Sequence, residues 1–257
     1  MNASSYYADL TAQYQRYAGA ARGWHHGLWE PDVHTHQQAL LRSNERLLRG
    51  LTIGPASQVL DVGCGIGGFA TWAAQTHHCH VTGITVCAEH VDQAAAAASA
   101  AGVGERCSFQ WMDMDRPTLD ANAFDCVVNQ ETLCHAADKG QFLQRVFETL
   151  KPGGTWRAID FNVHEPALNP AQQTAYDDVC EGFHIPSMAR GSDVERWLRD
   201  AGFVEIVVED ATPLVRPTAA LIVRMCFFPL LMARLRLDWI AYSFDPVRRS
   251  NRRGHVI

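Results

Sequence analysis

The chain has 257 residues, of which 47% are hydrophobic, and its formal net charge at pH 7 is -6. A chain of this length and composition can bury one substantial core, so a single α/β domain with appended segments is favoured over two independent domains. The acidic balance argues against a nucleic-acid-binding protein.

The cysteines, the first residues and the apolar runs indicate which sites are absent and where the protein is expected to reside. The eight cysteines form no Cys-x-x-Cys pair, so neither a disulfide framework nor a metal site is predicted. The first residues, MNASSYYADL, lack the basic and apolar regions of a secretory signal, so a cytoplasmic protein is expected. The apolar segment Ala219–Ala233 is short and contains Arg224 and Pro229, so stable membrane insertion is not expected.

Predicted strands and helices alternate along most of the chain. Strands are expected at Gln58–Val62, His80–Ile84, Arg106–Met112, Phe124–Asn129, Trp156–Phe161 and Val204–Glu209. Helices are expected at Phe69–Thr76, Ala88–Ala101, Phe142–Leu150 and Val194–Ala201, with stop signals at residues 151–154 and at Gly202. This alternation predicts an α/β fold with a doubly wound, mostly parallel sheet.

Two segments flank this predicted core. Residues 1 to about 50 are expected to form a helical N-terminal arm. After Pro213 there are eight arginines against only Asp238 and Asp245, which gives this end of the chain a net charge near +6. Such a charge asymmetry indicates either a solvated basic tail or a surface that binds an anion or a partner.

The stretch VLDVGCGIGG at residues 59–68 follows the first predicted strand and begins a helix. Its glycines at 63, 65 and 68 have the spacing of a dinucleotide-binding loop, and this context favours a nucleotide site. An NAD site needs an acidic residue at the end of the second strand, where this chain has Thr85. An acid is present instead at Asp61, and Gly67 adds a third alternate glycine.

These residues resemble a known family. VLDVGCGIGG resembles the first motif of the class I S-adenosylmethionine-dependent methyltransferases, and VTGITVCAEHVDQA resembles the second-strand segment of their sterol, tocopherol and cyclopropane-fatty-acid branch. WMDMD, FDCVVNQETLCHAADK and LKPGGTW resemble later motifs, and YYADL with GWHHGLWEP is similar to the arm that closes over the cofactor. The resemblance covers about residues 5–210. The resemblance indicates the type of reaction specifically, but it says little about the acceptor molecule.

The resemblance implies a Rossmann-like class I methyltransferase fold in three regions. Residues 1–50 would be the arm that closes over the cofactor, 51–165 the S-adenosylmethionine-binding core, and 166–257 a lid, the remaining core elements and a C-terminal substrate-binding segment.

The same resemblance implies a set of contacts to S-adenosyl-L-methionine. They are expected from Asp61, Gly63, Gly65, Gly67, Thr85, Asp113, Met114, Asn129, Trp24 and His26. Asp61 would orient the loop and the methionine end, Thr85 would meet the ribose, and Asp113 would meet the adenine amino group. Asp113 can also be explained as a solvated turn acid. The branch commonly has Gln where His90 stands, so no ribose contact is assigned to His90.

Glu131 and His135 are the candidate catalytic residues. They lie at positions i and i+4 just after the fourth strand, so a helical turn there would place both on one face over the site. Either side chain can remove a proton from an acceptor or from a cation formed by methylating an alkene. The structural alternatives are that Glu131 caps the next helix and that His135 is a packed residue.

The acceptor is expected to be a small, apolar molecule. Its candidate contacts are His25, Trp29, Tyr176, Phe183, Arg248 and Arg249. The aromatic members can also be explained as plain core. The arginines would suit a prenyl diphosphate or an acidic natural product equally well.

Carbon methylation of an isoprenoid-like acceptor is the leading prediction for the function. The alternatives are O- or N-methylation of a natural product, and binding of the cofactor without methyl transfer. The sequence leaves a homo-oligomer open.

Overall fold

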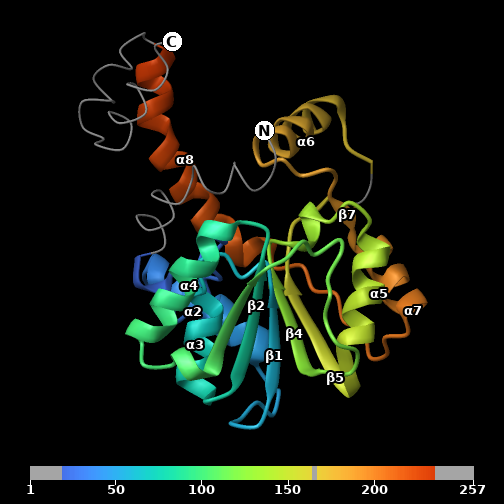
Figure 1. Cartoon of the computed structure of the whole chain (residues 1–257). Helices are drawn as coiled ribbons and strands as arrows, with labels where there is room; N and C mark the ends of the chain where they lie inside the picture. Colours follow the sequence, from blue (N-terminus) through green and yellow to red (C-terminus); the bar gives the residue numbers. More distant parts are fainter. Residues whose placement is uncertain (1–18, 164–166, 235–257) are drawn as a thin grey trace, which may run out of the picture.

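The computed structural model describes residues 19–163 and 167–234 (Figure 1). Its central sheet has five strands in the order β3-β2-β1-β4-β5, and every pair is parallel. The strands are β1 (Gln58–Val62), β2 (His80–Thr85), β3 (Cys107–Trp111), β4 (Phe124–Gln130) and β5 (Leu150–Ile159). The predicted α/β fold with a parallel sheet is therefore confirmed.

Helices cover both faces of the sheet, as Figure 1 shows. One face carries α2 (His36–Leu48), α3 (Gly68–His77) and α4 (Ala88–Ala100), and the other carries α5 (Lys139–Thr149) and α7 (Gly191–Ala201). Leu60 of β1 packs in the same apolar cluster as Phe142 of α5, whereas Val59 packs in the same cluster as Ala70 of α3. Because both faces are buried at the centre of the sheet, β1 and β4 contain short apolar runs in the sequence.

The strand order places a ligand site at one edge of the sheet. β1 lies between β2 on one side and β4 on the other, so the direction of chain winding reverses between β1 and β4. In open α/β sheets, ligands bind at such a switch point, outside the carboxyl ends of the strands. The glycine turn after β1 and the segment after β4 meet there.

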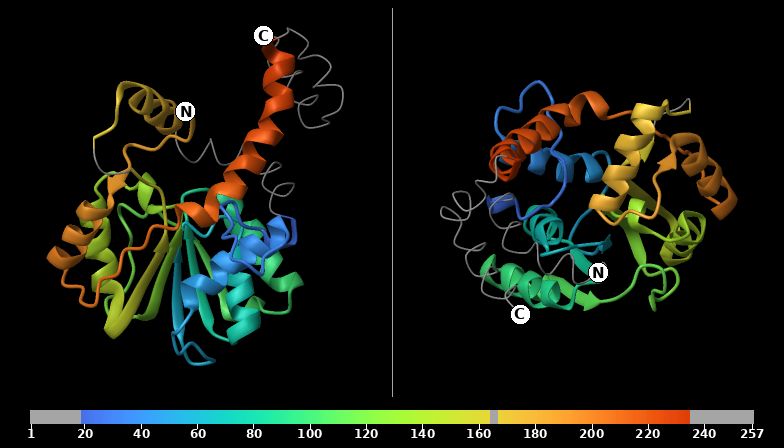
Figure 2. Two further views of the ribbon diagram at one scale, coloured as in Figure 1. Left: turned by 180° about the vertical axis from the view of Figure 1, so that it is seen from behind. Right: turned by 90° about the horizontal axis from the view of Figure 1, so that it is seen from above.

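Two further helices stand at this same end of the molecule (Figure 2). Helix α6 (Pro170–Gly182) follows β6 (Asn162–Val163) and precedes β7 (Ala189–Arg190), which pair with each other in a two-residue ladder. Asn169 caps α6 in a capping box with Gln172, and no residue of α6 is buried. Helix α8 (Thr212–Arg234) leaves the body as one long rod. Short 3-10 turns complete the described elements: η1 (Gly19–Ala21), η2 (Gly104–Arg106) and η3 (Leu133–His135).

The predicted strand at Val204–Glu209 is wrong. This segment is irregular, and Val204 and Val207 are 82% and 83% exposed. Arg46 of α2 binds Glu209 at 2.6 Å, so the chain crosses from the α7 face to the α2 face past the edge of the sheet. A segment that crosses an edge cannot run along it, so it cannot pair with β5.

The predicted helical arm is only partly right. Within its described part, helix is confined to Gly19–Ala21 and to α2, and residues 22–35 form an irregular loop. Gly27 lets this loop pack closely against α2, because a Cβ atom there would lie 2.5 Å from the Cβ of Ala39. Residues 1–18 lie outside the described part.

The predicted stop at residues 151–154 is an irregularity within β5 rather than a turn before it. The pairing with β4 jumps from Phe124 opposite Leu150 to Cys126 opposite Thr155, and Gly153 has φ +78°. The extra residues therefore form a bulge.

Among the described residues, no helix is both long enough and apolar enough to cross a membrane.

Candidate active site

The glycine turn after β1 brings the backbone close to its neighbours. Gly63 and Gly67 both have φ +79°, and a Cβ on Gly63 would lie 2.2 Å from Oγ1 of Thr132. A Cβ on Gly67 would lie 2.8 Å from the Cβ of Ala94. Gly65 also has a positive φ of +50°, but a Cβ there would meet nothing within 4 Å. Gly63 and Gly67 thus let the turn pack, while Gly65 leaves space for a ligand.

Asp61 lies in β1 just below this turn and is only 3% exposed. Its Oδ2 atom is buried without a hydrogen-bond partner in the structure. Burial raises the pKa of the Asp61 carboxyl to about 7. An acceptor that is buried and unsatisfied costs free energy, so this atom suits a ligand that brings a hydrogen-bond donor or a positive charge.

The residues expected to bind ribose and adenine lie at the ends of β2 and β3. Thr85 is the last residue of β2, and its Oγ1 accepts from the backbone N–H of Cys87 at 3.3 Å. Asp113 is exposed, and its Oδ1 accepts from the N–H of Asp115 at 2.9 Å. Asp113 is therefore an exposed acid that stabilises a turn, which is the alternative that the sequence left open. The side chain of Met114 packs against the apolar cluster behind the sheet, so only its backbone is left for a ligand.

Asn129 and Asp160 shape the segment that follows β4. Asn129 donates to Asp160 at 3.2 Å and accepts from Nε1 of Trp156 at 2.8 Å, so its buried amide belongs to the scaffold. The buried Asp160 carboxylate accepts from the backbone N–H groups of Thr132, Leu133 and Cys134 at 2.7–3.1 Å. Burial raises the pKa of the Asp160 carboxyl to about 6, although hydrogen bonds from the Cys134 side chain and from the Thr132 and Phe161 backbones lower it. Asp160 thus caps η3 and leaves Glu131 free for another role.

Glu131 pairs with the arm. Its Oε1 accepts from the backbone N–H of His26 at 2.6 Å and lies 2.9 Å from Nδ1 of the same residue. Burial lowers the pKa of His26, but the hydrogen bond and charge of Glu131 outweigh it, so the net pKa is raised. Burial lowers the pKa of the neighbouring His25, whose Nδ1 lies 3.0 Å from the carbonyl oxygen of His26. The site therefore holds one histidine that favours the charged form and one that favours the neutral form.

The predicted alignment of Glu131 with His135 is wrong. Glu131 has a left-handed backbone with φ +50°, and helical geometry starts only at η3, so the two residues do not stack at i and i+4. The predicted cap is also absent, because Asp138 caps α5 by accepting from Gln141 N–H at 3.0 Å. His135 is half-buried and contacts the backbone of His184, and burial lowers its pKa. A positive φ in a non-glycine residue marks a strained position of the kind found at functional sites.

The loop that carries His26 is fixed from two further sides. Thr218 of α8 is fully buried, and its Oγ1 accepts from Gly27 N–H at 3.2 Å and from Nε1 of Trp29 at 2.9 Å. On the α2 side, Ser43 donates to the carbonyl of His26 at 3.1 Å. Trp29 is thereby tied to the scaffold, and α8 becomes a support for the site. Trp24 is half-buried in the same loop.

Replacing Thr218 with Val should loosen the loop without emptying its space, because the two side chains have similar shape. Two buried donors, Gly27 N–H and Trp29 Nε1–H, lose their acceptor, so we expect the free energy of unfolding to fall by about 1–3 kcal/mol. Thermal unfolding measures this loss, and Thr218→Ser, which keeps the hydroxyl, is the control. A Val variant as stable as the Ser variant would contradict this support.

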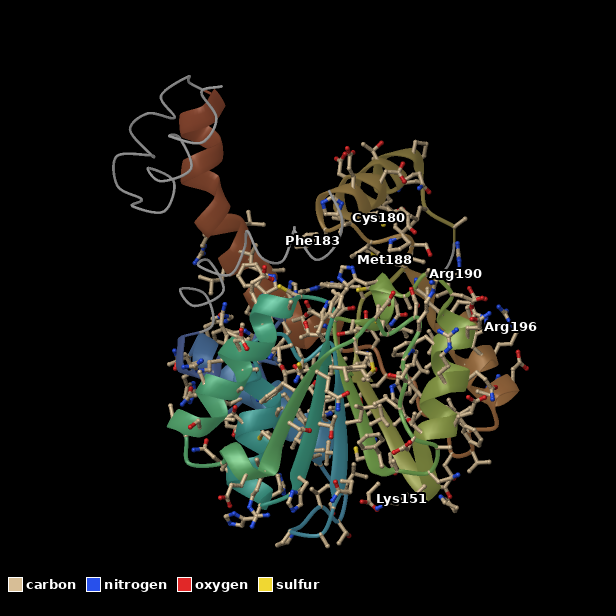
Figure 3. The ribbon with its side chains drawn as sticks, in the orientation of Figure 1. Lys151, Cys180, Phe183, Met188, Arg190 and Arg196 are labelled. Atoms are coloured by element: carbon tan, nitrogen blue, oxygen red, sulfur yellow. The ribbon has the colours of Figure 1, made fainter. Side chains whose placement is uncertain are left out.

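The residues expected to line an acceptor pocket beyond the sheet lie in and after α6. The hydroxyl of Tyr176 accepts from Met188 N–H at 3.0 Å, so it ties α6 to the segment that returns to β7. Phe183 is 41% exposed, and Figure 3 shows it with Cys180 and Met188 between α6 and the body of the protein. Phe183 is thus available to an apolar molecule at the carboxyl end of the sheet. Arg248 and Arg249 lie outside the described residues.

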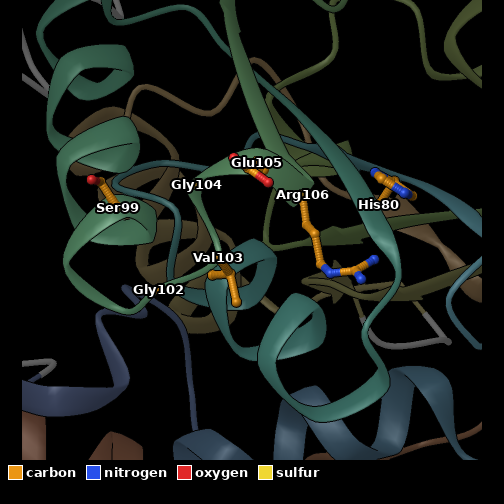
Figure 4. Close-up of a pocket in the computed structure, with 7 residues that line it drawn as sticks. All are labelled: His80, Ser99, Gly102, Val103, Gly104, Glu105 and Arg106. Atoms are coloured by element: carbon orange, nitrogen blue, oxygen red, sulfur yellow. The ribbon is translucent and has the colours of Figure 1, made fainter.

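A hollow elsewhere on the surface does not belong to this site (Figure 4). Its lining includes His80, Gly104 and Arg106, which lie at the start of β2 and just before β3. These are the amino ends of the strands, opposite the glycine turn.

Comparisons with known proteins decide between the nucleotides that a glycine turn can bind. Residues 59–154 match a family described as a methyltransferase domain. The chain is 30% identical over 220 residues to the O-methyltransferase resE of Aspergillus sclerotiorum, a match that covers 82% of this chain and 81% of that one.

This chain belongs to the class I S-adenosylmethionine-dependent methyltransferases.

Solved structures agree with this methyltransferase fold. The [4+2]-cyclase SpnF is 27% identical, with a TM-score of 0.71 over 83% of this chain and 75% of that one. Geranyl diphosphate C-methyltransferase from Streptomyces coelicolor, in complex with Mg2+, geranyl-S-thiolodiphosphate and S-adenosyl-L-homocysteine, is 18% identical, with a TM-score of 0.71 over 83% of each chain. The latter likeness shows the fold alone.

The methyltransferase cofactor, S-adenosyl-L-methionine, fits the residues at the switch point. It carries a cationic amino group and a sulfonium, and Asp61 offers a buried acceptor atom without a partner. It carries no phosphate, and the open space at Gly65 allows close approach of the backbone without a phosphate cradle. The contacts predicted from Asp61, Gly63, Gly65, Gly67, Thr85, Asp113, Met114, Asn129, Trp24 and His26 all stay predictions.

Sequence reasoning missed two residues of this methyltransferase site. Asp160 was given no role, although it lies near the end of the predicted strand Trp156–Phe161, at the carboxyl end of a parallel sheet, where ligands bind. Thr218 gave no signal, because its partners Gly27 and Trp29 precede it by 191 and 189 residues.

Proposed function

We propose that this methyltransferase transfers a methyl group to a hydroxyl of a small, largely apolar natural product. The pairing of Glu131 with His26 at the end of β4 carries the proposal. The proposal assigns the acid–base role to His26 instead of the predicted Glu131 and His135 pair. Glu131 becomes the residue that orients His26.

His26 has the features of a general base. Its Nδ1 faces Glu131 at 2.9 Å, which leaves Nε2 as the ring atom that takes a proton from an acceptor hydroxyl. The carboxylate of Glu131 fixes the ring and stabilises the imidazolium that forms, as the acid does in a Ser-His-Asp arrangement. The pKa of His26 is raised by Glu131, which strengthens it as a base.

The cofactor, when bound, supplies an electrophilic methyl group on a sulfonium. The chain's own contribution is alignment and proton removal. Asp61 would hold the amino end of the cofactor, Gly65 would admit it, and the arm loop would keep His26 near the acceptor. Alignment of this kind lowers the barrier of a displacement reaction by making it intramolecular.

An apolar acceptor is supported by the exposed ring of Phe183 under α6 and by the half-buried Trp29. A hydroxyl as the methylated group is supported by the relative resE, which is an O-methyltransferase. The predicted role of Arg248 and Arg249 in holding a diphosphate or carboxylate stays a prediction.

Carbon methylation of an alkene is the second candidate. The ring of Phe161 lies edge-on to His26, with 5.2 Å between the ring centres, so an aromatic ring and the Glu131 carboxylate are close together. Such a pair can stabilise a carbocation and remove its proton.

Incubation with isotope-labelled cofactor and pools of acceptors tests the proposal. We expect an acceptor that bears a hydroxyl to gain one methylene unit by mass spectrometry, and NMR of the labelled methyl to place it on oxygen. A methyl on carbon would favour the second candidate. Conversion of an acceptor without gain of label would contradict both.

A further inference from the structure

Residues 183–190, called the return segment below, attach α6 to the body of the protein. No residue of α6 is buried, but Ile185 and Ala189 of the return segment are. The first residue of this segment, Phe183, carries the exposed ring that is proposed to meet the acceptor, and Figure 3 shows it between α6 and the body. The position of the return segment over the sheet therefore decides how Phe183 is presented to an acceptor.

Lys139 reaches the return segment from the start of α5. Its Nζ donates to the carbonyl oxygen of Ala136 at 3.0 Å and to the Oγ of Ser187 at 3.5 Å. Ala136 directly follows η3, in the turn after Glu131, whereas Ser187 belongs to the return segment. One ammonium group thus joins the turn after Glu131 to the segment that carries Phe183.

The charge of Lys139 is costly in this place. The side chain is 5% exposed, and among the described residues its Nζ donates only to uncharged oxygens. Burial lowers the pKa of Lys139, and the charges of Asp160 and Asp115 oppose this effect only in part. A buried charge without an ion-pair partner costs free energy, so stability alone does not account for a lysine here.

The use of lysine in this chain also sets Lys139 apart. The sequence has twenty arginines and two lysines, and the other lysine, Lys151, forms an ion pair with Asp125 at 2.8 Å at the amino end of the sheet. An ammonium is compact and can be satisfied by a few oxygens, whereas the rigid fork of a guanidinium brings more donors. Lysine therefore suits a buried place that offers only two acceptors.

We propose that Lys139 is a positioning residue, which fixes the return segment against the turn after Glu131 and thereby sets how tightly the acceptor binds. This inference rests on the proposed function, in which an apolar acceptor lies beside Phe183. Lys139 acts through Ser187 and touches neither acceptor nor cofactor. Its loss should therefore weaken acceptor binding and leave cofactor affinity unchanged.

Hydrogen exchange followed by mass spectrometry tests the inference without an acceptor. In Lys139→Met, which keeps the length of the side chain, residues 183–190 should exchange about tenfold faster, the effect of one lost hydrogen bond to a charged group. Peptides from β1 should exchange as before. Lys151→Met removes the other lysine and is the matched control, so it should leave residues 183–190 unchanged.

Ser187→Ala tests the same contact from its exposed side, where the substitution leaves the core intact. It should give part of the increase in exchange. Adding it to Lys139→Met should increase exchange no further, because the two groups form one contact. Unchanged exchange of residues 183–190 in both single variants would overturn the inference, and so would an equal increase throughout the protein.

Thymol, a small apolar molecule with one hydroxyl, serves as the acceptor probe. Calorimetry on protein loaded with S-adenosyl-L-homocysteine should show that Lys139→Met binds thymol about tenfold more weakly, with unchanged affinity for S-adenosyl-L-homocysteine itself. Lys151→Met should change neither affinity. Equal thymol binding by Lys139→Met and the unmodified chain would overturn the inference. If the unmodified chain bound no thymol, this would count against the proposed acceptor class, while hydrogen exchange would still decide the role of Lys139.

Discussion

Glu131→Gln should lower turnover by a factor on the order of 10²–10⁴ while leaving cofactor affinity nearly unchanged. Gln keeps the size of the side chain and can still accept from the backbone N–H of His26. It carries no charge, so it cannot stabilise an imidazolium at His26, whose Nδ1 lies 2.9 Å from the carboxylate. Steady-state kinetics and calorimetry with the cofactor measure the two quantities.

Glu209→Gln is the control for this variant, because Glu209 is an exposed glutamate that pairs with Arg46 of α2. His135→Ala should lower turnover much less than Glu131→Gln, since the His135 ring contacts the backbone of His184 and the Glu131 charge acts on it more weakly than that contact does. If both single variants and the double variant kept full activity, the acid–base role of this segment would be excluded.

Asp61→Asn should weaken cofactor binding by roughly 1–3 kcal/mol, the range for loss of a charge-assisted contact. The carboxyl of Asp61 has a pKa of about 7, so affinity for the cationic cofactor should rise as pH increases through this value. The Asn variant should lose this pH dependence. Calorimetry at a series of pH values measures both effects, and unchanged affinity in a folded variant would remove Asp61 from the site.

Asp61→Asn should also affect the stability of the protein without cofactor, and there the effect should be favourable at neutral pH. The folded pKa of Asp61 lies above its ordinary value, so the folded state binds the proton more tightly than the unfolded state. Stability from this group is therefore lost as pH rises from about 4 to about 7. Above that range Asp61→Asn should stabilise the protein. Asp125→Asn is the control, because Asp125 forms an ion pair with Lys151 at the amino end of the sheet.

Short-range signals predicted the core of the fold well. Each strand from β1 to β5 overlaps a predicted strand, although the first half of β5 was predicted as a turn, and local sequence is enough to identify β1 and β4 as short apolar runs. The glycine turn was also predictable, because its three positive φ angles require glycine at fixed spacing. Val204–Glu209 misled the prediction, since Val204 and Val207 face solvent along a crossing segment.

The catalytic geometry was not predictable in the same way. Glu131 and His26 are 105 residues apart, and their contact depends on a left-handed turn at Glu131 that no residue type signals. Asp160 holds the residues after this turn by accepting from the backbone N–H groups of Thr132 and Leu133. Contacts between distant segments are set by the tertiary fold, so the i and i+4 rule for a helix gave the wrong partner.

The dependence of turnover on pH in the unmodified chain and in Glu131→Gln tests the central claim most directly. A general base must be neutral to act, so turnover should rise with pH through the pKa of His26, which Glu131 holds above its ordinary value. In Glu131→Gln this rise should move to lower pH, together with the fall in maximal turnover. A rise at the same pH in both proteins would contradict the assignment of His26 as the base and of Glu131 as the residue that orients it.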